Sequence, residues 1–257
     1  LGCAVDAATR GYSVALFEWE DFAKATSSRS TKLVHGGVRY LAQGDVPLVL
    51  EALHERGLLK KNAPHLVKDQ WFLIPNYRHW DNFLYTVGLT VYDILAGRLS
   101  FGRSKYISSK KTVEYLPIVQ EKGLKGGVVY HDGQFDDSRL AINLAQSCVE
   151  KGGCPLNRMQ VVGILHNAAG VAAGVKVKDL LSGQLYEVKA KAVINATGIF
   201  VDSIMEMDVP THEHMVKPSQ GVHLVLDRSF LQSDYAIMIP KTVSYTHLRA
   251  HETGAYL

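Results

Sequence analysis

The sequence has little cysteine and little net charge. Its 257 residues include three cysteines, and none forms a Cys-x-x-Cys pair. A disulfide framework, a zinc motif and a redox motif are therefore unsupported, and a reducing compartment fits best. The 28 Lys and Arg residues against 25 Asp and Glu leave a net charge of +3, which is too small to indicate nucleic-acid binding.

The sequence also lacks a hydrophobic run long enough to cross a bilayer. The apolar stretch 83–99 is shorter than the roughly 20 residues that a spanning helix needs, and it contains Asp93 and Arg98. It predicts a buried helix, and a helix lying on a membrane surface is the alternative. With 47% apolar and 21% charged residues, the chain has an ordinary globular composition, and its length suits one large or two modest domains.

The two ends of the chain are unusual. There is no initiating Met at Leu1, and from about Val243 the sequence has no apolar period of either kind. His247 and His251 are four positions apart, but a metal site would need a further ligand. We expect a fragment of a longer protein, with residues 243–257 a non-native or disordered tail.

The N-terminal residues have the pattern of half a dinucleotide-binding unit. Small residues at helical spacing in 3–10 are followed by Gly11, a short strand at 12–18, and Glu18 at its end. In a βαβ dinucleotide unit, such an acid accepts hydrogen bonds from the adenosine ribose. The alternative is a solvated acid in a loop. The glycine-rich loop of such a unit would lie just before Leu1.

Residues 22–44 are dense in hydroxyl groups and glycine. Five Ser and Thr side chains precede His35-Gly-Gly37, which is followed directly by Arg39 and Tyr40. Capping of a helix N-terminus explains one or two hydroxyl groups but not five of them next to His-Gly-Gly. This segment is therefore a candidate site.

The remaining chain predicts alternating helices and strands. Helices are expected at 46–61 and 138–150, and strands at 71–75, 126–133, 161–166, 171–178 and 185–188. The apolar run 190–195 predicts a buried parallel strand that leads into Asn-Ala-Thr-Gly198, and 217–226 predicts a glycine turn and a further strand.

Taken together, several segments resemble the FAD-dependent, quinone-linked glycerol-3-phosphate dehydrogenase family. The matching segments are 6–11, 26–41, 51–56, 63–66, 130–133, 136–140, 193–198 and 221–223, in the family's order. The resemblance implies an α/β fold in which a Rossmann-type FAD-binding domain is interrupted by an α+β substrate or cap region, as in amino-acid oxidases and glutathione reductase. The expected divisions are FAD-binding parts at 1–45 and 126–200, a helical cap or substrate region at 46–125, the start of a substrate sheet at 201–242, and the tail.

The resemblance implies roles for cofactor-binding residues. Glu18 would bind the adenosine ribose, and Gly36 and Gly37 would let the backbone approach the flavin ring. Other expected contacts to FAD come from Thr26, Ser27, Ser28, Val161, Thr197 and Gly198. The family's Gly-x-Gly-x-x-Gly loop and its later Gly-Thr-Thr-Asp segment are absent, so we expect weak FAD binding and slow turnover by these residues alone.

The resemblance also implies catalytic residues and partners. His35 is the candidate base or polarising group, Arg39 the clamp for the substrate phosphate, and Tyr40 and His223 further substrate contacts. No metal is expected. The implied reaction oxidises glycerol 3-phosphate and passes electrons through FAD to a quinone, at the cytoplasmic face of a bacterial inner membrane or at the mitochondrial inner membrane, with a homodimer as one arrangement. The alternatives are an oxidase that uses oxygen, an amine- or hydroxy-acid-oxidising flavoenzyme, and a Rossmann-like module without activity.

Overall fold

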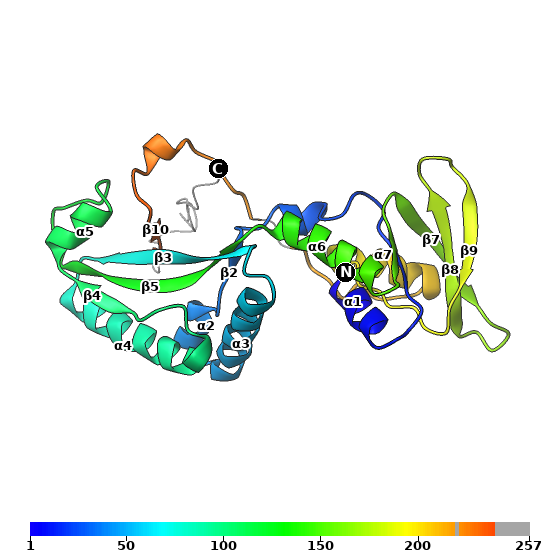
Figure 1. Cartoon of the computed structure of the whole chain (residues 1–257), viewed down its shortest axis with the longest axis horizontal. Coiled ribbons are helices and arrows are strands. Elements are labelled where there is room, and N and C mark those ends of the chain that lie inside the picture. Colours follow the sequence, from blue (N-terminus) through cyan, green and yellow to red (C-terminus); the bar gives the residue numbers. More distant parts are fainter. Residues whose placement is uncertain (219–220, 240–257) are drawn as a thin grey trace. The chain divides into compact units, whose positions relative to one another are not determined.

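The computed structural model describes residues 1–218 and 221–239, and the predicted tail with His247 and His251 lies outside these residues. The chain divides into two compact units, each assembled from two separate segments (Figure 1). The first unit combines Leu1–Arg29 with Asp137–Val222, and the second combines Ser30–Asp136 with the described residues that follow Val222.

The first unit begins with the predicted helix and strand. Helix α1 (Gly2–Thr9) ends before Gly11, whose φ of +85° confirms the glycine stop, and strand β1 (Ala15–Phe17) ends directly before Glu18. Strand β6 (Cys154–Leu156) follows helix α6 (Asp137–Glu150) and pairs in parallel with β1. The side chains of Ala4 and Ala8 are buried, and their small size lets α1 pack against α6.

A three-stranded antiparallel sheet completes most of the first unit. Its strands β7 (Met159–His166), β8 (Ala172–Asp179) and β9 (Leu185–Lys189) confirm the three predicted strands. After it come the short 3₁₀ helix η3 (Gly198–Phe200) and helix α7 (Val201–Asp208).

Two predicted strands are wrong. Residues 191–197 form no strand, and the side chain of Ile194 is 69% exposed. Residues 221–227 also form no strand, and Val225 is 86% exposed. A strand needs a neighbour that accepts and donates its backbone hydrogen bonds, and no described strand pairs with either segment. An apolar run in a sequence does not show whether that neighbour is present.

The second unit is built on a five-stranded sheet with the order β10-β3-β5-β2, and β4 also pairs with β5. Strands β3 (Val67–Asn76) and β5 (Gly126–Phe135) are antiparallel over their full length, from Val67 opposite Phe135 to Asn76 opposite Gly126. The shorter strands are β2 (Leu33–Val34), β4 (Lys105–Ile107) and β10 (Ala236–Ile237).

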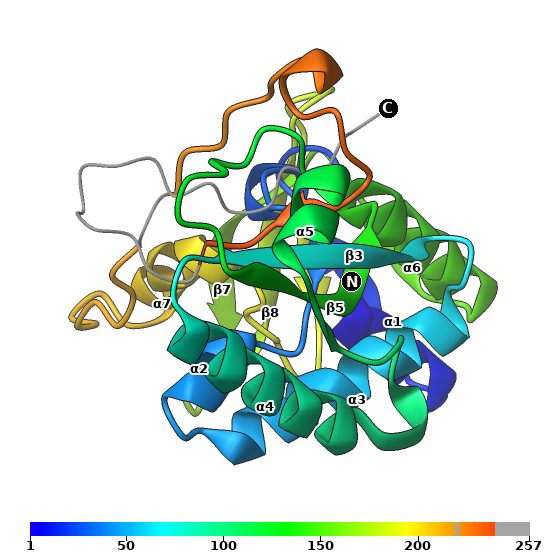
Figure 2. The ribbon, with the colours of Figure 1, turned by 90° about the vertical axis from the view of Figure 1, so that its left-hand side faces the viewer.

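Helices cover both faces of this sheet. Helices α2 (Val38–Ala42), α3 (Val46–Asn62) and α4 (His79–Ala96) lie on one face, and α5 (Ser109–Tyr115) lies on the other (Figures 1 and 2). Helix α3 confirms the predicted helix at 46–61. It begins where the Asp45 carboxylate accepts the Leu48 N–H group, as expected of an N-cap. The short 3₁₀ helices η1 (Ala25–Ser28), η2 (Gly97–Leu99) and η4 (Arg228–Phe230) complete the elements of the described chain.

Helix α4 corrects the prediction of a buried helix at 83–99, because only one of its faces is buried. One face is buried through Leu89 and Tyr92. The opposite face is exposed and apolar, and it carries Trp80, Phe83, Leu84, Val87, Val91 and Ile94. Within the described residues, the structure contains no helix whose length and apolarity would suit a membrane crossing.

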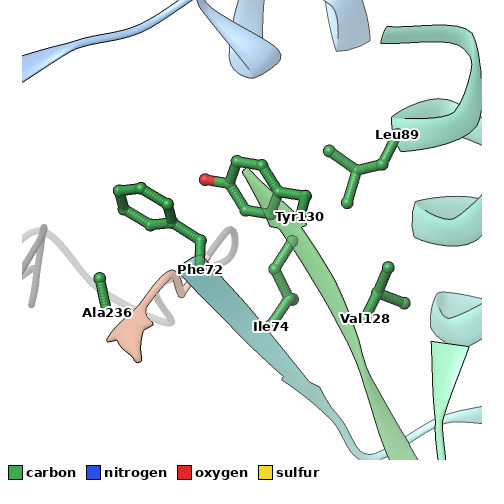
Figure 3. Close-up of a cluster of buried hydrophobic side chains, with 6 residues drawn as sticks. All are labelled: Phe72, Ile74, Leu89, Val128, Tyr130 and Ala236. Atoms are coloured by element: carbon green, nitrogen blue, oxygen red, sulfur yellow. The ribbon is translucent and has the colours of Figure 1, made fainter. Parts of the chain in front are cut away.

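The core of the second unit follows the alternation of side chains along β3 and β5. Phe72 and Ile74 join Leu89 of α4, Val128, Tyr130 and Ala236 in one cluster (Figure 3). Leu73 points to the other face, where it meets Leu116 and Leu231. A third cluster, which includes Val49, Leu53, Tyr92 and Ala96, joins α3 to α4. The candidate segment around His35 lies between β2 and α2, next to this third cluster.

Candidate functional site

His35 stands on a tight turn that requires glycine. Gly37 has φ +73° and ψ +52°, a left-handed conformation that favours glycine. In this turn the Gly37 N–H group donates to Nδ1 of His35 at 3.1 Å. Because a backbone N–H group can only donate, Nδ1 carries the lone pair, and the neutral ring bears its proton on Nε2. The ring of His35 is exposed, so this N–H group is available as a donor.

The backbone of Gly36 closely approaches a phenol of the same unit. The Gly36 N–H group donates to the Tyr92 hydroxyl oxygen at 2.8 Å. A Cβ atom at this position would lie 2.5 Å from the same oxygen. Any side chain larger than hydrogen would therefore displace Tyr92 or the turn.

Below the turn lies a buried ion pair that the sequence did not reveal. Nη1 of Arg56 donates to Oδ1 of Asp132 at 2.7 Å, and the Tyr92 hydroxyl donates to Oδ2 at 2.9 Å. Burial raises the pKa of Asp132, and the positive charge of Arg56 opposes that rise. Burial, reinforced by the charge of Asp132, raises the pKa of Tyr92 well above its ordinary value. The phenol therefore stays protonated.

Arg56 does not lie on the solvent face of its helix. Its side chain is almost completely buried, and its guanidinium lies 4.4 Å from the centre of the Phe101 ring. A signal was present in the sequence, because Arg56 follows Val49 and Leu53 by seven and three positions. This spacing places the three residues on one face of a helix, and both apolar members of that face are buried.

The other candidate catalytic residues are less closely joined to the turn. The Tyr40 ring lies against Gly37 and is 46% exposed. Arg39 belongs to α2, but its side chain lies outside the described part of the structure. His223 is exposed in the stretch 221–227, which forms no helix or strand.

The first unit carries most of the candidate cofactor contacts. Glu18 is half-buried at the carboxyl end of β1, where Oε1 accepts the Glu20 N–H group at 2.9 Å. Thr26, Ser27 and Ser28 are exposed in η1. The residues before this group are strained, because Ala23 and Ala25 have φ values of +66° and +59°.

Val161, Thr197 and Gly198 occupy two further places in the first unit. Val161 is half-buried in β7, opposite Val177. The Thr197 hydroxyl donates to Oδ1 of Asn195 at 2.8 Å, and Gly198 follows with a φ of +58°. Thr197 and Gly198 therefore form a turn that glycine allows, whereas Val161 shows no comparable special geometry.

The residues present fit part of FAD. Glu18 stands at the carboxyl end of the parallel strand β1, and a carboxylate in that place is suited to ribose hydroxyl groups. The glycine-rich loop that would hold a pyrophosphate is not in the 257 residues. Within 1–218 and 221–239, no group of three or more His, Cys, Asp and Glu side chains could hold a metal ion.

Comparison with known proteins assigns the family. Residues 1–256 match the family described as FAD dependent oxidoreductase. The chain belongs to this family. The expected cofactor, FAD, is therefore confirmed. The expected Rossmann-like α/β fold is confirmed as well.

Individual relatives carry more specific names than the family does. The chain is 41% identical over 230 residues to the aerobic glycerol-3-phosphate dehydrogenase of Staphylococcus haemolyticus. The aligned stretch covers 89% of this chain and 41% of that protein. It is 40% identical over 253 residues to the human mitochondrial glycerol-3-phosphate dehydrogenase, covering 94% of this chain and 35% of that protein. The resemblance found in the sequence is thus confirmed, although the chain spans less than half the length of these relatives.

Solved structures agree with this assignment. The glycerol-3-phosphate dehydrogenase of Bacillus halodurans, complexed with FAD, matches with a TM-score of 0.61 and 32% identity, over 81% of this chain and 34% of that one. The L-proline dehydrogenase of P. horikoshii matches with a TM-score of 0.57 at 18% identity, over 82% of this chain and 53% of that one, which supports the fold alone.

Proposed function

We propose that this protein oxidises sn-glycerol 3-phosphate to dihydroxyacetone phosphate with FAD as its cofactor. The observation that carries the proposal is the identity of 41% and 40% to a bacterial and a human enzyme of that name, over nine-tenths of the chain. The His35–Gly37 turn supports it, because this turn requires glycine and presents the Nε2–H group of His35 as a hydrogen-bond donor.

FAD, when bound, supplies the acceptor for the hydride from C2 of the substrate. We assign the adenosine ribose to Glu18. The pyrophosphate or flavin side is assigned to Thr26, Ser27 and Ser28, together with Thr197 and Gly198. The strain at Ala23 and Ala25 supports a functional role for the segment that follows them, since strained backbone is concentrated at sites of function.

His35 acts as a polarising donor in this proposal rather than as a base. Oxidation of the alcohol transfers a hydride from C2 and releases the proton of the C2 hydroxyl group to solvent water, which reaches the exposed His35 ring, and negative charge develops on the hydroxyl oxygen during this step. Because Nδ1 of His35 accepts the Gly37 N–H group, Nε2 already carries a proton. It can donate a hydrogen bond to that oxygen but cannot take its proton. Arg39 binds the substrate phosphate, for which a guanidinium group is well suited, and Tyr40 and His223 provide further contacts.

The proposal also names the electron acceptor. We infer a quinone, and with it peripheral attachment to a bacterial inner membrane or to the mitochondrial inner membrane, because relatives carry the names aerobic and mitochondrial dehydrogenase. The intact enzyme would reduce a soluble quinone analogue without producing peroxide. Peroxide formed in proportion to substrate would favour an oxidase instead.

The test is anaerobic bleaching of flavin absorbance. The 257-residue chain is mixed with FAD, and glycerol 3-phosphate is added; we expect bleaching, slow because the glycine-rich loop is absent from the sequence. Arg39→Ala should abolish bleaching, whereas Arg98→Ala, a change at an exposed arginine in η2, should not. FAD that binds without bleaching would favour a module without activity, and bleaching by an amino acid or hydroxy acid would favour another flavoenzyme.

His35 has its own test in the same assay. His35→Gln keeps an amide N–H donor near the position of Nε2, so it should retain more activity than His35→Ala. Equal loss in both variants would contradict the role as donor.

A further inference from the structure

Three buried polar side chains meet directly beneath the candidate site. Arg56 of α3, Tyr92 of α4 and Asp132 of β5 are 1%, 1% and 2% exposed. They come from three separate elements of the second unit, and none was assigned a role from the sequence. Because burying a charged pair is costly, an apolar cluster of similar volume would serve stability as well. Their polarity therefore indicates a role other than packing.

The hydrogen bonds of this network have a defined direction. The Gly36 N–H group can only donate, so the Tyr92 oxygen accepts it at 2.8 Å. The phenol proton is then directed to Oδ2 of Asp132 at 2.9 Å. Oδ1 of the same carboxylate accepts Nη1 of Arg56 at 2.7 Å and the Gly133 N–H group at 3.3 Å. Arg56 and Gly133 thus fix Asp132, which in turn fixes Tyr92.

The turn couples this network to His35. The amide of Gly36 is held by Tyr92, and the next amide, that of Gly37, donates to Nδ1 of His35. The planar peptide unit that carries the Gly36 N–H group also contains Cα of His35, so holding this amide restricts the backbone from which the imidazole extends. Leu53 packs on Gly36 from α3, which leaves the turn little room to move.

We propose that Tyr92 is a positioning residue for His35: held by Asp132 and Arg56, its hydroxyl group fixes the Gly36 amide, and this fixes the turn that sets the tautomer and orientation of the imidazole. The inference rests on the proposed function only for its effect on turnover. The structural part concerns Gly36 and His35 themselves and does not require that any particular substrate is used.

The test compares Tyr92→Phe with Tyr106→Phe in the full chain. The first removes only the hydroxyl group of the network. The second removes the hydroxyl group of a half-exposed tyrosine that donates to the Lys125 carbonyl oxygen at 3.1 Å, in the same unit but outside the network. Hydrogen exchange reports the Gly36 amide, and ¹⁵N NMR of labelled histidine, assigned with His35→Gln, reports the tautomer.

In the unmodified chain we expect a protected Gly36 amide and an imidazole protonated on Nε2. In Tyr92→Phe, exchange at Gly36 should rise roughly tenfold, as expected for loss of one buried hydrogen bond, and the tautomers should become mixed. Tyr106→Phe should change neither. A Gly36 amide that exchanges like an exposed one in the unmodified chain would overturn the proposal even if Tyr92→Phe does not fold. An unchanged tautomer in a folded Tyr92→Phe chain would also overturn it.

Turnover separates this inference from the proposed function. With FAD and glycerol 3-phosphate, Tyr92→Phe should lower kcat roughly tenfold with little change in KM, because it displaces a donor without removing a substrate contact. If the unmodified chain binds FAD but does not oxidise glycerol 3-phosphate, the proposed function fails. The exchange and NMR results still decide the role of Tyr92.

Discussion

Nη1 of Arg56 lies 2.7 Å from Oδ1 of Asp132, and the two side chains are only 1% and 3% exposed. The pair connects residues that are 76 positions apart and so ties helix α3 to strand β5. Removing one partner of such a pair leaves the other charge buried without compensation. The stability of the second unit therefore depends on both residues.

Arg56→Met should therefore destabilise the protein strongly. Methionine keeps much of the side-chain volume but leaves the Asp132 carboxylate without its counter-ion, at a cost of about 3–5 kcal/mol. Urea denaturation measures the change. The control is Arg158→Met, which breaks the Arg158–Glu20 pair at 3.0 Å, where the side chains are 44% and 41% exposed. An exposed pair of this kind contributes about 0–1 kcal/mol, so equal effects of the two variants would contradict the structure.

Gly36→Ala should be destabilising, although it adds a single methyl group. The new Cβ atom would stand 2.5 Å from the Tyr92 oxygen, so the turn or the tyrosine must shift, at a cost of about 1–3 kcal/mol. Gly88→Ala is the matched control, because a Cβ atom there meets nothing within 4 Å and the position lies inside α4. Alanine is the better helix former by about 1 kcal/mol, so this variant should melt at a higher temperature.

The two faces of α4 should respond differently to truncation. Leu89 is 1% exposed and packs in the cluster of Figure 3, so Leu89→Ala should cost about 2–5 kcal/mol. Ile94 is 70% exposed, and Ile94→Ala should change stability by less than about 0.5 kcal/mol. Thermal denaturation of both variants measures the difference. A large loss from Ile94→Ala would mean that this face is covered in solution.

The sequence predicted those elements whose pattern is local. Helix α3 has its N-cap at Asp45, and strand β7 has a run of apolar residues, so both could be placed within two residues of their ends. The segment around His35 was identified for the same reason, because its unusual residues are adjacent in the chain.

Features that depend on distant partners could not be predicted in the same way. The spacing of Arg56 from Val49 and Leu53 could indicate that it is buried, but nothing near it in the chain points to Asp132, and only the fold brings the two together. The run 190–195 looked like a buried strand because its apolar residues do not reveal whether a neighbouring strand is present. The solvent-facing side of α4 was misjudged for a related reason, since apolar residues on both faces hide which face meets the sheet.

Asp202 should make the first unit sensitive to acid. Its carboxylate accepts the N–H groups of Met215 at 3.1 Å and Val216 at 3.0 Å, and Nε2 of His212 lies 3.0 Å from Oδ1. These contacts, with the two backbone donors first, lower the pKa of Asp202 to about 2. The unfolded chain, in which Asp has a pKa of about 3.9, takes up this proton more readily than the folded one. The carboxylate therefore stabilises the fold above about pH 4, and this stabilisation is lost as the pH falls toward 2.

Thermal denaturation of Asp202→Asn between pH 5 and pH 2 tests this expectation. The asparagine variant should melt below the unmodified chain at pH 5, because an amide has one acceptor oxygen where the carboxylate has two. The difference should shrink as the pH falls, since protonation removes the advantage of the carboxylate. Asp6→Asn, which breaks an exposed pair with Arg10 at 2.8 Å, is the control and should show no comparable convergence. A difference between Asp202→Asn and the unmodified chain that stays constant down to pH 2 would mean that the charge of Asp202 does not hold the 212–216 segment.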